Sequence, residues 1–447
     1  MKKDLTQGNV QRTLLVFAGP MMLGNLLQQC YNIADTLIVG RYLGAGALAA
    51  VGTAYTLMTF LTSILIGLCM GCGSVFSFYY GKKDEKKMKE SMRTSFLFVG
   101  GISVIMNVSV FVGMDAILKM LRIPRDIYAV MKEYTWAVFW GILFVFLYNF
   151  FAFLLRAMGN SLTPLLFLGA ASVVNIVLDL LFVVTFEMGA AGAAWATVAA
   201  QVLAGIGILV YTWVKEPDLR FFNIRDIKGG WQVKETLPEV VRFSVAASVQ
   251  QSVMNFGILM IQGLVNSFGT AVIAAFAAAV KIDSFAYMPA QEFSNSFSIF
   301  TSQNNGAGDH KRVREGVRTA VKLSMGFCLA VSFIIFLSSK YLMMIFIQPE
   351  ETEIIRIGVE YLRIEGSCYC GIGLLFLLYA YYRGMGKPEM SVVLTVISLG
   401  TRVAISYALA PTLGVQIIWC AIPIGWVLAD VAGVAYMRKL MKKKVMD

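Results

Sequence analysis

Two hydrophilic residues interrupt the apolar stretch 173–184, which reads VVNIVLDLLFVV. Asn175 and Asp179 lie four residues apart, so a helix would place both side chains on one face. A carboxylate near the middle of a membrane-spanning helix costs about 2.5–3.5 kcal/mol on insertion scales, and it usually faces the bundle interior and marks an ion or substrate path. The spacing therefore predicts an ion site on a transmembrane helix.

The composition agrees with a membrane setting for this helix. Of the 447 residues, 58% are hydrophobic and 15% are charged, whereas soluble domains have about 45–50% apolar and about 25% charged residues. The apolar residues form runs of twenty or more, long enough to cross a hydrocarbon core of about 30 Å. We predict an all-α polytopic membrane protein. Cys69 and Cys72 have CxxC spacing inside such a run, and we interpret them as packing residues.

The hydropathy pattern predicts twelve transmembrane helices. Their expected ranges are 13–40, 46–79, 94–121, 128–155, 162–186, 190–214, 239–266, 270–301, 317–347, 353–382, 388–412 and 414–437. Most of the lysines and arginines fall on the side that holds both termini, which positive-inside bias makes cytoplasmic. The basic loop KMLRIPRDIYAVMKE is an exception on the other side. We expect a cytoplasmic (inner) membrane location with both termini cytoplasmic, and the net charge of +11 to set topology rather than to bind nucleic acid.

The polar segment 215–238 divides the chain into two halves that resemble each other. GKKDEKKMKESMRTS (81–95) and GAGDHKRVREGVRTA (306–320) match at six of fifteen positions, at an offset of 225. LLRAMGN (154–160) and YYRGMGK (381–387) are related by an offset of 227. We predict an N-terminal lobe at 1–214, a cytoplasmic linker at 215–238 and a C-terminal lobe at 239–447. Six spans per half make this the parallel kind of repeat, with two pseudo-symmetric six-helix lobes.

The two halves differ at the residues of the proposed ion site. At the offset of 227, Asn175 corresponds to Arg402 and Asp179 corresponds to Ser406. The second half has lost the carboxylate and gained a cation. An ion site on this helix therefore belongs to the first half only.

At this point the sequence resembles the multidrug and toxic compound extrusion (MATE) family. The resemblance rests on the two-lobe plan, the loops with GKKD and GAGD, a first span with a proline fifteen residues before the aspartate of YNIADTLIVGRYLGAGALAAVG, and NIVLD in the fifth span. It implies an antiporter that expels small organic cations in exchange for Na⁺ or H⁺. By resemblance, the coupling-ion residues, and Na⁺ ligands if the ion is sodium, are Asp35, Asn175, Asp179 and Thr197.

One branch of the family is better known for a second-lobe site, with a glutamate in span seven and an aspartate in span ten. Here span seven has Gln250 and Gln251, and we expect no acid deep in span ten. This departure argues against a sodium site in the second lobe.

The four residues of the first-lobe set have a common chemistry. Two carboxylates, an amide carbonyl and a hydroxyl are hard oxygen donors, which suit hard cations. Two neighbouring carboxylates also repel each other when both are ionised, so a proton could replace the metal ion. Na⁺ coupling, H⁺ coupling or both therefore remain open, and Asn175 and Thr197 favour sodium. Asn175 and Thr197 could instead form an interhelical hydrogen bond.

The second half contributes candidates for a substrate cavity. Asp283 and Glu292 in span eight could attract a cationic drug, and Gln251 could line the same cavity. Arg402 could instead pair with either acid. In the first span, Pro20 removes a helical hydrogen bond and is a candidate hinge.

Two other classes of protein compete with the antiporter interpretation. The alternative is a flippase or exporter of a lipid-linked or amphiphilic substrate, which should have a strongly cationic cavity. A membrane enzyme would need a nucleophile–base pair or metal ligands, and we find neither, so we expect no catalytic residues. RGMGKPE lacks the GxxxxGK[ST] spacing of a phosphate loop, so we expect an ion gradient to drive transport without other cofactors. We expect a monomer in the lipid bilayer.

Overall fold

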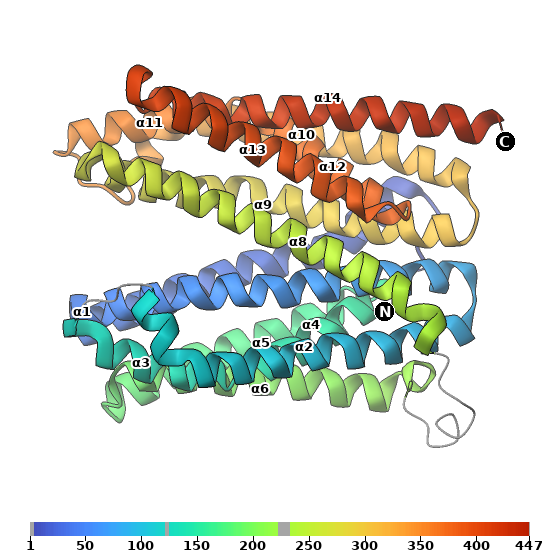
Figure 1. Cartoon of the computed structure of the whole chain (residues 1–447), viewed down its shortest axis with the longest axis horizontal. Coiled ribbons are helices and arrows are strands. Elements are labelled where there is room, and N and C mark those ends of the chain that lie inside the picture. Colours follow the sequence, from blue (N-terminus) through green and yellow to red (C-terminus); the bar gives the residue numbers. More distant parts are fainter. Residues whose placement is uncertain (1–3, 121–124, 222–232, 447) are drawn as a thin grey trace. The chain divides into compact units, whose positions relative to one another are not determined.

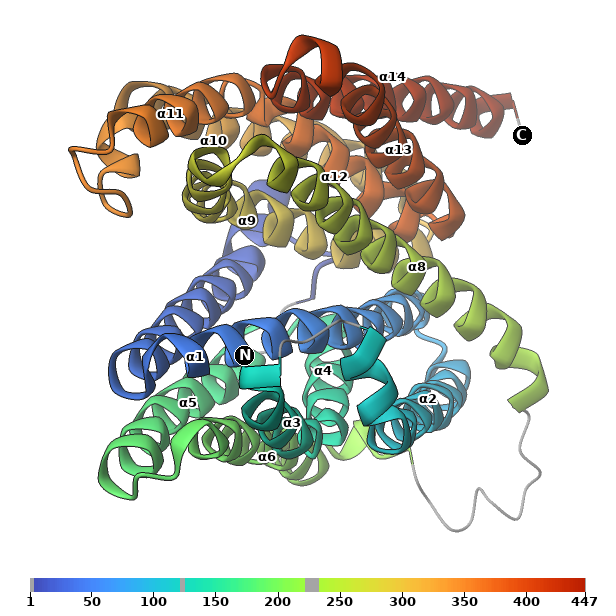
Figure 2. The same ribbon diagram turned by 60° about the vertical axis from the view of Figure 1, so that its left-hand side comes forward.

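The protein consists of helices throughout the residues that its computed structural model describes, which are 4–120, 125–221 and 233–446. Figures 1 and 2 show these helices from two directions. The long helices are α1 (Val10–Lys82), α2 (Glu85–Met120), α3 (Arg125–Phe139), α4 (Ile142–Ala157), α5 (Leu162–Asp179), α6 (Gly189–Lys215), α8 (Val233–Val265), α9 (Thr270–Gly306), α10 (His310–Met343), α11 (Thr352–Gly366), α12 (Tyr369–Gly384), α13 (Pro388–Leu413) and α14 (Gln416–Met446). Short turns of helix are η1 (Leu180–Thr185), η2 (Pro217–Leu219) and η3 (Asn266–Phe268).

The lengths and hydropathies of these helices suit a membrane. Among the described residues, nine helices are long and apolar enough to span one, and two bent helix pairs raise the number to eleven. α1 contains two of the expected spans, because its helix breaks at Gly44 (φ 81°, ψ −179°). The less apolar part of α1 before that break supplies a helix in the position of the first span. The structure therefore confirms an all-α membrane fold and is consistent with twelve transmembrane helices.

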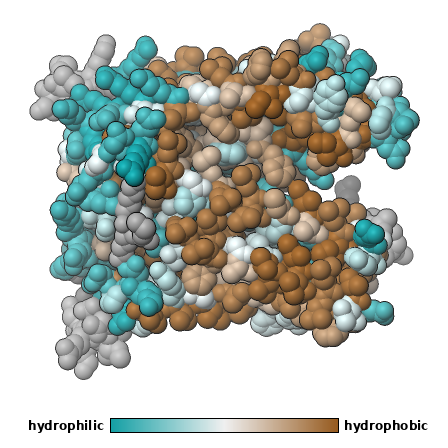
Figure 3. All heavy atoms as spheres, turned by 180° about the vertical axis from the view of Figure 1, so that it is seen from behind, coloured by the Kyte–Doolittle hydropathy of each residue, from teal (hydrophilic) through white to brown (hydrophobic). Residues whose placement is uncertain are grey.

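Large apolar side chains on the outside of the helices support the same conclusion. Val112 is 85% exposed, Tyr341 is 71% exposed and Ile105 is 66% exposed. On the face drawn in Figure 3, hydrophobic side chains cover the middle of the helices and hydrophilic ones gather towards their ends. Extended apolar surface is rare on soluble monomers, whereas lipid tails solvate it well.

By contact, the chain forms two compact units. The first contains Gly19–Ser248, and the second contains Leu5–Ala18 and Val249–Asp447. These units differ from the predicted lobes at two places, since residues 5–18 group with the second unit and residues 239–248 group with the first. Part of the predicted linker, 222–232, lies outside the described residues. The lobe boundaries at 214 and 239 stay a prediction.

The N-terminal segment is held to the second unit by Arg312 of α10. The guanidinium donates hydrogen bonds to the carbonyl oxygens of Leu5 (3.2 Å), Gln7 (2.7 Å) and Gly8 (2.7 Å). Asn304 of α9 donates a further hydrogen bond to the Leu5 carbonyl at 3.2 Å. Leu5 itself is fully buried. These contacts explain why the start of the chain belongs with helices of the second half.

The start of α8 is held to the first unit by close helix packing against α1. A Cβ added at Gly71 would lie 2.4 Å from the Phe243 carbonyl oxygen, and one added at Gly67 would lie 2.5 Å from the Ser248 Cα. Only glycine permits this approach. Cys72 lies within 3.1 Å of the Ser244 hydroxyl at the same crossing, and both side chains are buried. This contact agrees with packing as the role of the CxxC segment.

Bends in two spans support the predicted internal repeat. α3 and α4 meet at 42° and together form the span expected at 128–155. α11 and α12 meet at 51° and form the span expected at 353–382. The first break lies at 140–141 and the second at 367–368. Their separation equals the offset that relates LLRAMGN to YYRGMGK, so the bends are equivalent features of the two halves.

Backbone conformations repeat in the same way. Left-handed φ angles, which favour glycine, mark helix ends or breaks at corresponding positions of the two halves. The pairs are Gly44 with Gly269, Lys83 with Gly308, Gly159 with Gly386, and Gly189 with Gly414. Three of these pairs have the offset of 225, and the pair at 159 and 386 has the offset of 227.

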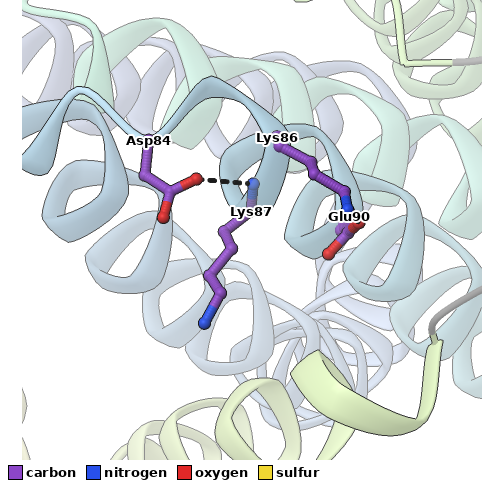
Figure 4. A network of polar contacts seen from close by, with 4 residues as sticks. All are labelled: Asp84, Lys86, Lys87 and Glu90. Atoms are coloured by element: carbon purple, nitrogen blue, oxygen red, sulfur yellow. Dashed lines mark hydrogen bonds and ion pairs between the residues drawn. The ribbon is translucent and has the colours of Figure 1, made fainter.

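The repeated polar loops also begin their helices alike. Asp84 accepts a hydrogen bond from the backbone N–H of Lys87 at 3.1 Å, as the dashed line in Figure 4 shows. Asp309 accepts one from the backbone N–H of Arg312 at 2.8 Å. Aspartate is a favourable N-cap because it satisfies a free N–H of the first helical turn. The matching aspartates of GKKD and GAGD are therefore helix caps.

Candidate functional site

Three helices of the first unit supply the residues predicted to hold the coupling ion. Asp35 lies on α1, Asn175 and Asp179 lie on α5, and Thr197 lies on α6. α5 and α6 pack against each other. The Asn175 side-chain amide points to the Thr197 hydroxyl oxygen at 3.5 Å, and that hydroxyl donates to the Ala193 carbonyl at 3.1 Å. The structure thus brings Asn175 and Thr197 together.

Four side-chain oxygens of this site are buried and lack hydrogen-bond partners among the described residues. Asp179 is fully buried and Asn175 is 1% exposed. Both carboxylate oxygens of Asp179, the amide oxygen of Asn175 and one carboxylate oxygen of Asp35 are left without a donor. Buried polar groups in proteins are normally hydrogen-bonded, and leaving one unpaired is costly. This set of oxygens therefore fits a cation or a proton as its partner.

The charges around the site also favour a cation or a proton as its partner. Asp35 and Asp179 are close enough for their charges to interact. Within the part of the chain that the structure describes, no lysine or arginine forms an ion pair with either carboxylate. Tyr31 and Tyr134 lie near both acids, but a tyrosine side chain carries no positive charge that could offset theirs. A buried acid and a half-buried acid side by side, with no ion pair to a basic residue, favour a proton or a cation as their partner.

The chemistry of the oxygen set suits a hard cation. The described residues include no group of three or more histidines, cysteines, aspartates or glutamates that could hold a metal ion. Two carboxylates with a neutral amide and a hydroxyl instead match the hard-oxygen donors that alkali and alkaline-earth cations prefer. The fit is to Na⁺ or H⁺ rather than to a softer metal.

A π-helical turn follows Asp179, which the sequence pattern did not indicate. α5 ends at Asp179, and η1 continues as π-helix to Thr185. The wider turn is completed by a hydrogen bond from the Phe186 N–H to the Leu181 carbonyl at 2.9 Å. π-helical turns are rare and frequently lie at functional sites. Asp179 therefore occupies the junction between two helix types.

α6 approaches this π-helical turn through a glycine. A Cβ added at Gly192 would lie 2.9 Å from the Met188 Cβ and 3.2 Å from Phe182. Gly192 lies five residues before Thr197, so this close packing fixes the start of α6 beside η1. The close approach at Gly192 therefore helps to set how far the Thr197 hydroxyl of α6 lies from α5.

The second unit contains its own buried polar cluster around Asp283. Asp283 is 4% exposed and accepts a hydrogen bond from the Tyr369 hydroxyl at 2.6 Å. Glu365 is 3% exposed and lies close enough to Asp283 for their charges to interact. One carboxylate oxygen of Glu365 has no hydrogen-bond partner among the described residues. The charge of Arg402 acts on both acids.

Glu365 corrects one prediction from the sequence. We expected no acid deep in span ten, and this was wrong, because Glu365 lies at the end of α11, next to the bend of that span. The apolar periodicity around YLRIEGSCYC is interrupted there, and this signal could have identified it. Asp430 of α14 is a second buried acid that the sequence analysis missed, 8% exposed and with one oxygen lacking a partner among the described residues.

The three residues predicted to line a substrate cavity have different surroundings. Asp283 is bonded within the cluster just described. Glu292, nine residues later on α9, accepts a hydrogen bond from Asn295 at 3.2 Å, and Asn295 accepts one from the buried Arg383 at 3.0 Å. Gln251 is half-buried on α8. Their role towards a substrate stays a prediction.

The hinge candidate lies near a boundary between the compact units. α1 is continuous through Pro20, and the chain passes from the second unit to the first between Ala18 and Gly19. A Cβ added at Gly19 would meet no atom within 4 Å. The location agrees with a hinge, which stays a prediction.

Comparison with known proteins gives a family for this arrangement. The MatE family model matches residues 20–181 and again 246–408. The chain belongs to the MATE family. The two matched segments of this MATE protein begin and end at nearly the same offset from each other as the repeated motifs. This match independently supports the internal repeat.

Relatives in sequence and neighbours in structure support the assignment to the MATE family. The chain is 32% identical over 395 residues to the probable multidrug resistance protein YpnP of Bacillus subtilis, a match covering 88% of this chain and 87% of the relative. It is 25% identical to the multidrug export protein MepA of Staphylococcus aureus, covering 86% and 84% of the two chains. A solved outward-facing MATE transporter of the MOP superfamily has a TM-score of 0.91 at 22% identity, covering 98% of this chain and 97% of that one, which supports the fold. The MATE protein is a multi-pass membrane transporter.

Proposed function

We propose that the protein is a secondary active multidrug efflux antiporter that exchanges small organic cations for Na⁺, H⁺ or both. Its membership of the MATE family and its similarity to multidrug resistance proteins support efflux of drugs. The single observation that supports ion coupling is the group of buried oxygens on Asp35, Asn175 and Asp179 that have no donor among the described residues.

The proposed coupling site works through the cost of buried charge. When Asp35 and Asp179 are both ionised, a cation binding among their oxygens and those of Asn175 and Thr197 removes an electrostatic penalty. Protonation of one carboxyl relieves the same penalty. Release of the ion restores the repulsion, and this difference can bias the transporter between two conformations. Asn175 and Thr197 offer ligands to Na⁺ that a proton does not need.

In the proposed cycle the two lobes rock so that a cavity opens to either side of the membrane in turn. The drug and the ion occupy different places, since the ion site belongs to the first lobe and Asp283, Glu292 and Gln251 are the candidates for substrate contacts. Pro20 of α1 would let the first span change shape when the ion site changes state. The protein would act as a monomer in the cytoplasmic membrane, with both termini on the cytoplasmic side.

The test separates the two possible driving ions. The purified protein is reconstituted in liposomes with a fluorescent organic cation, and a Na⁺ gradient or an H⁺ gradient is imposed alone. We expect the dye to move in the direction opposite to the flow of the driving ion under at least one of the two gradients. This movement should stop when an ionophore dissipates the gradient. Dye movement under neither gradient would contradict the antiporter proposal, and movement of a lipid-linked saccharide instead would favour the flippase alternative.

A further inference from the structure

A small cavity in the second unit is lined by three basic side chains. It has a volume of about 90 Å³ and lies among α10, the end of α12 and α14. His310 and Arg314 line it from the first turns of α10, and Lys387 lines it from the residue that precedes α13. The residues lining it within the described chain include no aspartate or glutamate. The cavity therefore suits an anion.

The rest of the lining is apolar. The wall is completed by Val313 and Val317 of α10, Tyr381 of α12, Met385 just after α12, and Leu440 of α14. Val313 and Tyr381 are buried. A site with cationic groups and an apolar wall suits an amphiphile better than a fully hydrated ion.

The position of the cavity along the spans places it at the membrane surface. The candidate spans of three helices begin or end at or next to its lining residues, namely at His310, at Pro388 and at Leu440. The phosphate groups of a bilayer lie at this depth. Basic pockets between transmembrane helices on the cytoplasmic side are suited to anionic lipid headgroups.

Lys387 is held in place at this site. Its ammonium group donates a hydrogen bond to the Tyr436 hydroxyl at 3.3 Å and lies 5.4 Å from the centre of that ring. The Tyr436 ring packs on Tyr382, whose hydroxyl donates to the Gly433 carbonyl at 2.5 Å. The charge is thus positioned by aromatic residues of α12 and α14.

The first half lacks this group of basic residues, although its fold is the same. At the repeat offsets, His310 corresponds to Glu85, Arg314 to Lys89, and Lys387 to Asn160. Asn160 is buried, and it accepts a hydrogen bond from the Thr163 N–H at the start of α5. Two of the three positions are therefore acidic or neutral there. The basic cavity is a specific feature of the second half rather than a consequence of the repeated fold.

We propose that this cavity binds the headgroup phosphate of an anionic phospholipid, with Arg314 and Lys387 contacting the phosphate oxygens and with the apolar wall contacting the glycerol and upper acyl chain. This site is separate from the coupling ion and does not depend on the antiporter proposal. It would give the second unit a preference for an anionic lipid leaflet.

The test measures lipid preference on the purified full-length protein by native mass spectrometry. Phosphatidylglycerol and phosphatidylcholine of the same acyl chains are compared at equal concentration. We expect the protein to bind phosphatidylglycerol about tenfold more tightly, as two positioned basic groups would provide. Arg314→Gln/Lys387→Gln should reduce this preference to about twofold or less, and Arg314→Lys/Lys387→Arg should retain it.

The matched control removes two charges from the corresponding loop of the first half. Lys86 and Lys89 lie on the first turns of α2, where Lys86 is 4.0 Å from Glu90 (Figure 4). Lys86→Gln/Lys89→Gln should keep the full preference. The proposal is overturned if both lipids bind equally, if the two double glutamine variants behave alike, or if inorganic phosphate at the lipid's concentration displaces phosphatidylglycerol. If Arg314→Gln/Lys387→Gln fails to fold, the exposed single variant Arg314→Gln should still lower the preference severalfold.

Discussion

The two halves of this transporter treat buried acids differently. In the first unit, Asp35 and Asp179 have carboxylate oxygens without donors among the described residues. In the second unit, Asp283 accepts a hydrogen bond from the Tyr369 hydroxyl, and Glu365 and Arg402 lie close enough for their charges to interact with it. The difference concerns Asp179 and Asp283, because one oxygen of Glu365 and one of Asp430 in the second unit also lack a partner among the described residues.

This difference follows from single residues at corresponding positions. Arg402 stands where the first half has Asn175, and Ser406 stands where it has Asp179. The charge of Arg402 acts on Asp283 and Glu365, whereas no lysine or arginine forms an ion pair with Asp35 or Asp179 among the described residues. We propose that ion exchange belongs to the first unit and that the acids around Asp283 in the second unit do not exchange the coupling ion.

The largest effect is expected for Asp179→Asn. This change removes one of the two charges of the proposed ion site and keeps the shape of the side chain, so gradient-driven dye efflux should fall to the level of empty liposomes. A charged ligand of this kind contributes about 1.5–3 kcal/mol, or at least about a tenfold change in ion affinity. The measurement is dye efflux from proteoliposomes under each gradient.

The control for that experiment is Asp115→Asn. Asp115 is an exposed acid of α2 whose carboxylate lies 2.6 Å from the Lys132 ammonium, so it already has a partner at the surface. Efflux by this variant should stay normal. Normal coupled efflux by Asp179→Asn would remove Asp179 from the mechanism.

A second prediction concerns the structural role of the second-unit cluster. Arg402→Met should lower the free energy of unfolding by about 1–3 kcal/mol, because it leaves buried acids without their cation. Arg402→Met combined with Asp283→Asn should recover most of that loss. Thermal unfolding of the purified protein measures both.

The comparison would fail if Arg402→Met were as stable as the parent protein. It would also fail if Asp283→Asn alone abolished coupled efflux as completely as Asp179→Asn while leaving the melting temperature unchanged. In that case the second-unit acids, and not only those of the first unit, would take part in ion exchange.

A smaller effect is expected for Thr197→Val. The hydroxyl lies at the 3.5 Å limit of a hydrogen bond to the Asn175 amide, and such interhelical bonds contribute about 0.6 kcal/mol in membranes. As a neutral ion ligand it should change the Na⁺ concentration for half-maximal efflux by about threefold. The H⁺-driven rate should change less. A shift of the H⁺-driven rate equal to the Na⁺-driven one would assign Thr197 to packing alone.

The smallest effects concern the repeated caps, Asp84 and Asp309. Asp84→Ala and Asp309→Ala each remove one N-cap bond and should each cost about 1 kcal/mol of stability or less. Because the two caps are equivalent in the repeat, their melting temperatures should fall by similar amounts. A much larger fall for Asp309→Ala would show that this cap also orients Arg312, which holds the N-terminal segment.

The sequence predicted the membrane fold well because hydropathy and length determine whether a helix can span a bilayer. The expected range 162–186 corresponds to α5 with η1, and 190–214 corresponds to α6. The two bent spans were predicted as continuous, since the residues around 140–141 and 367–368 are apolar enough to be helical. A short break changes backbone angles without changing the hydropathy that defines a span.

The candidate site was predicted less completely. Asn175 and Asp179 were identified from spacing on one helix, whereas Asp35 and Thr197 were identified from the resemblance to a family. Glu365 was missed because the apolar run around it was given more weight than the acid within it. The π-helical turn after Asp179 depends on how α5 packs against α6, and this tertiary contact has no pattern in a single helix.

The sequence alone establishes that the chain crosses a membrane many times, that its halves resemble each other, and that the first half has Asn175 and Asp179 where the second has Arg402 and Ser406. These properties depend on side-chain chemistry and on regular spacing. Only the tertiary structure decided which buried acids have partners, because hydrogen bonds such as that between Tyr369 and Asp283 join residues 86 positions apart. The same folding brings His310, Arg314 and Lys387 to one cavity, where the charges of Arg314 and Lys387 can act on one anion.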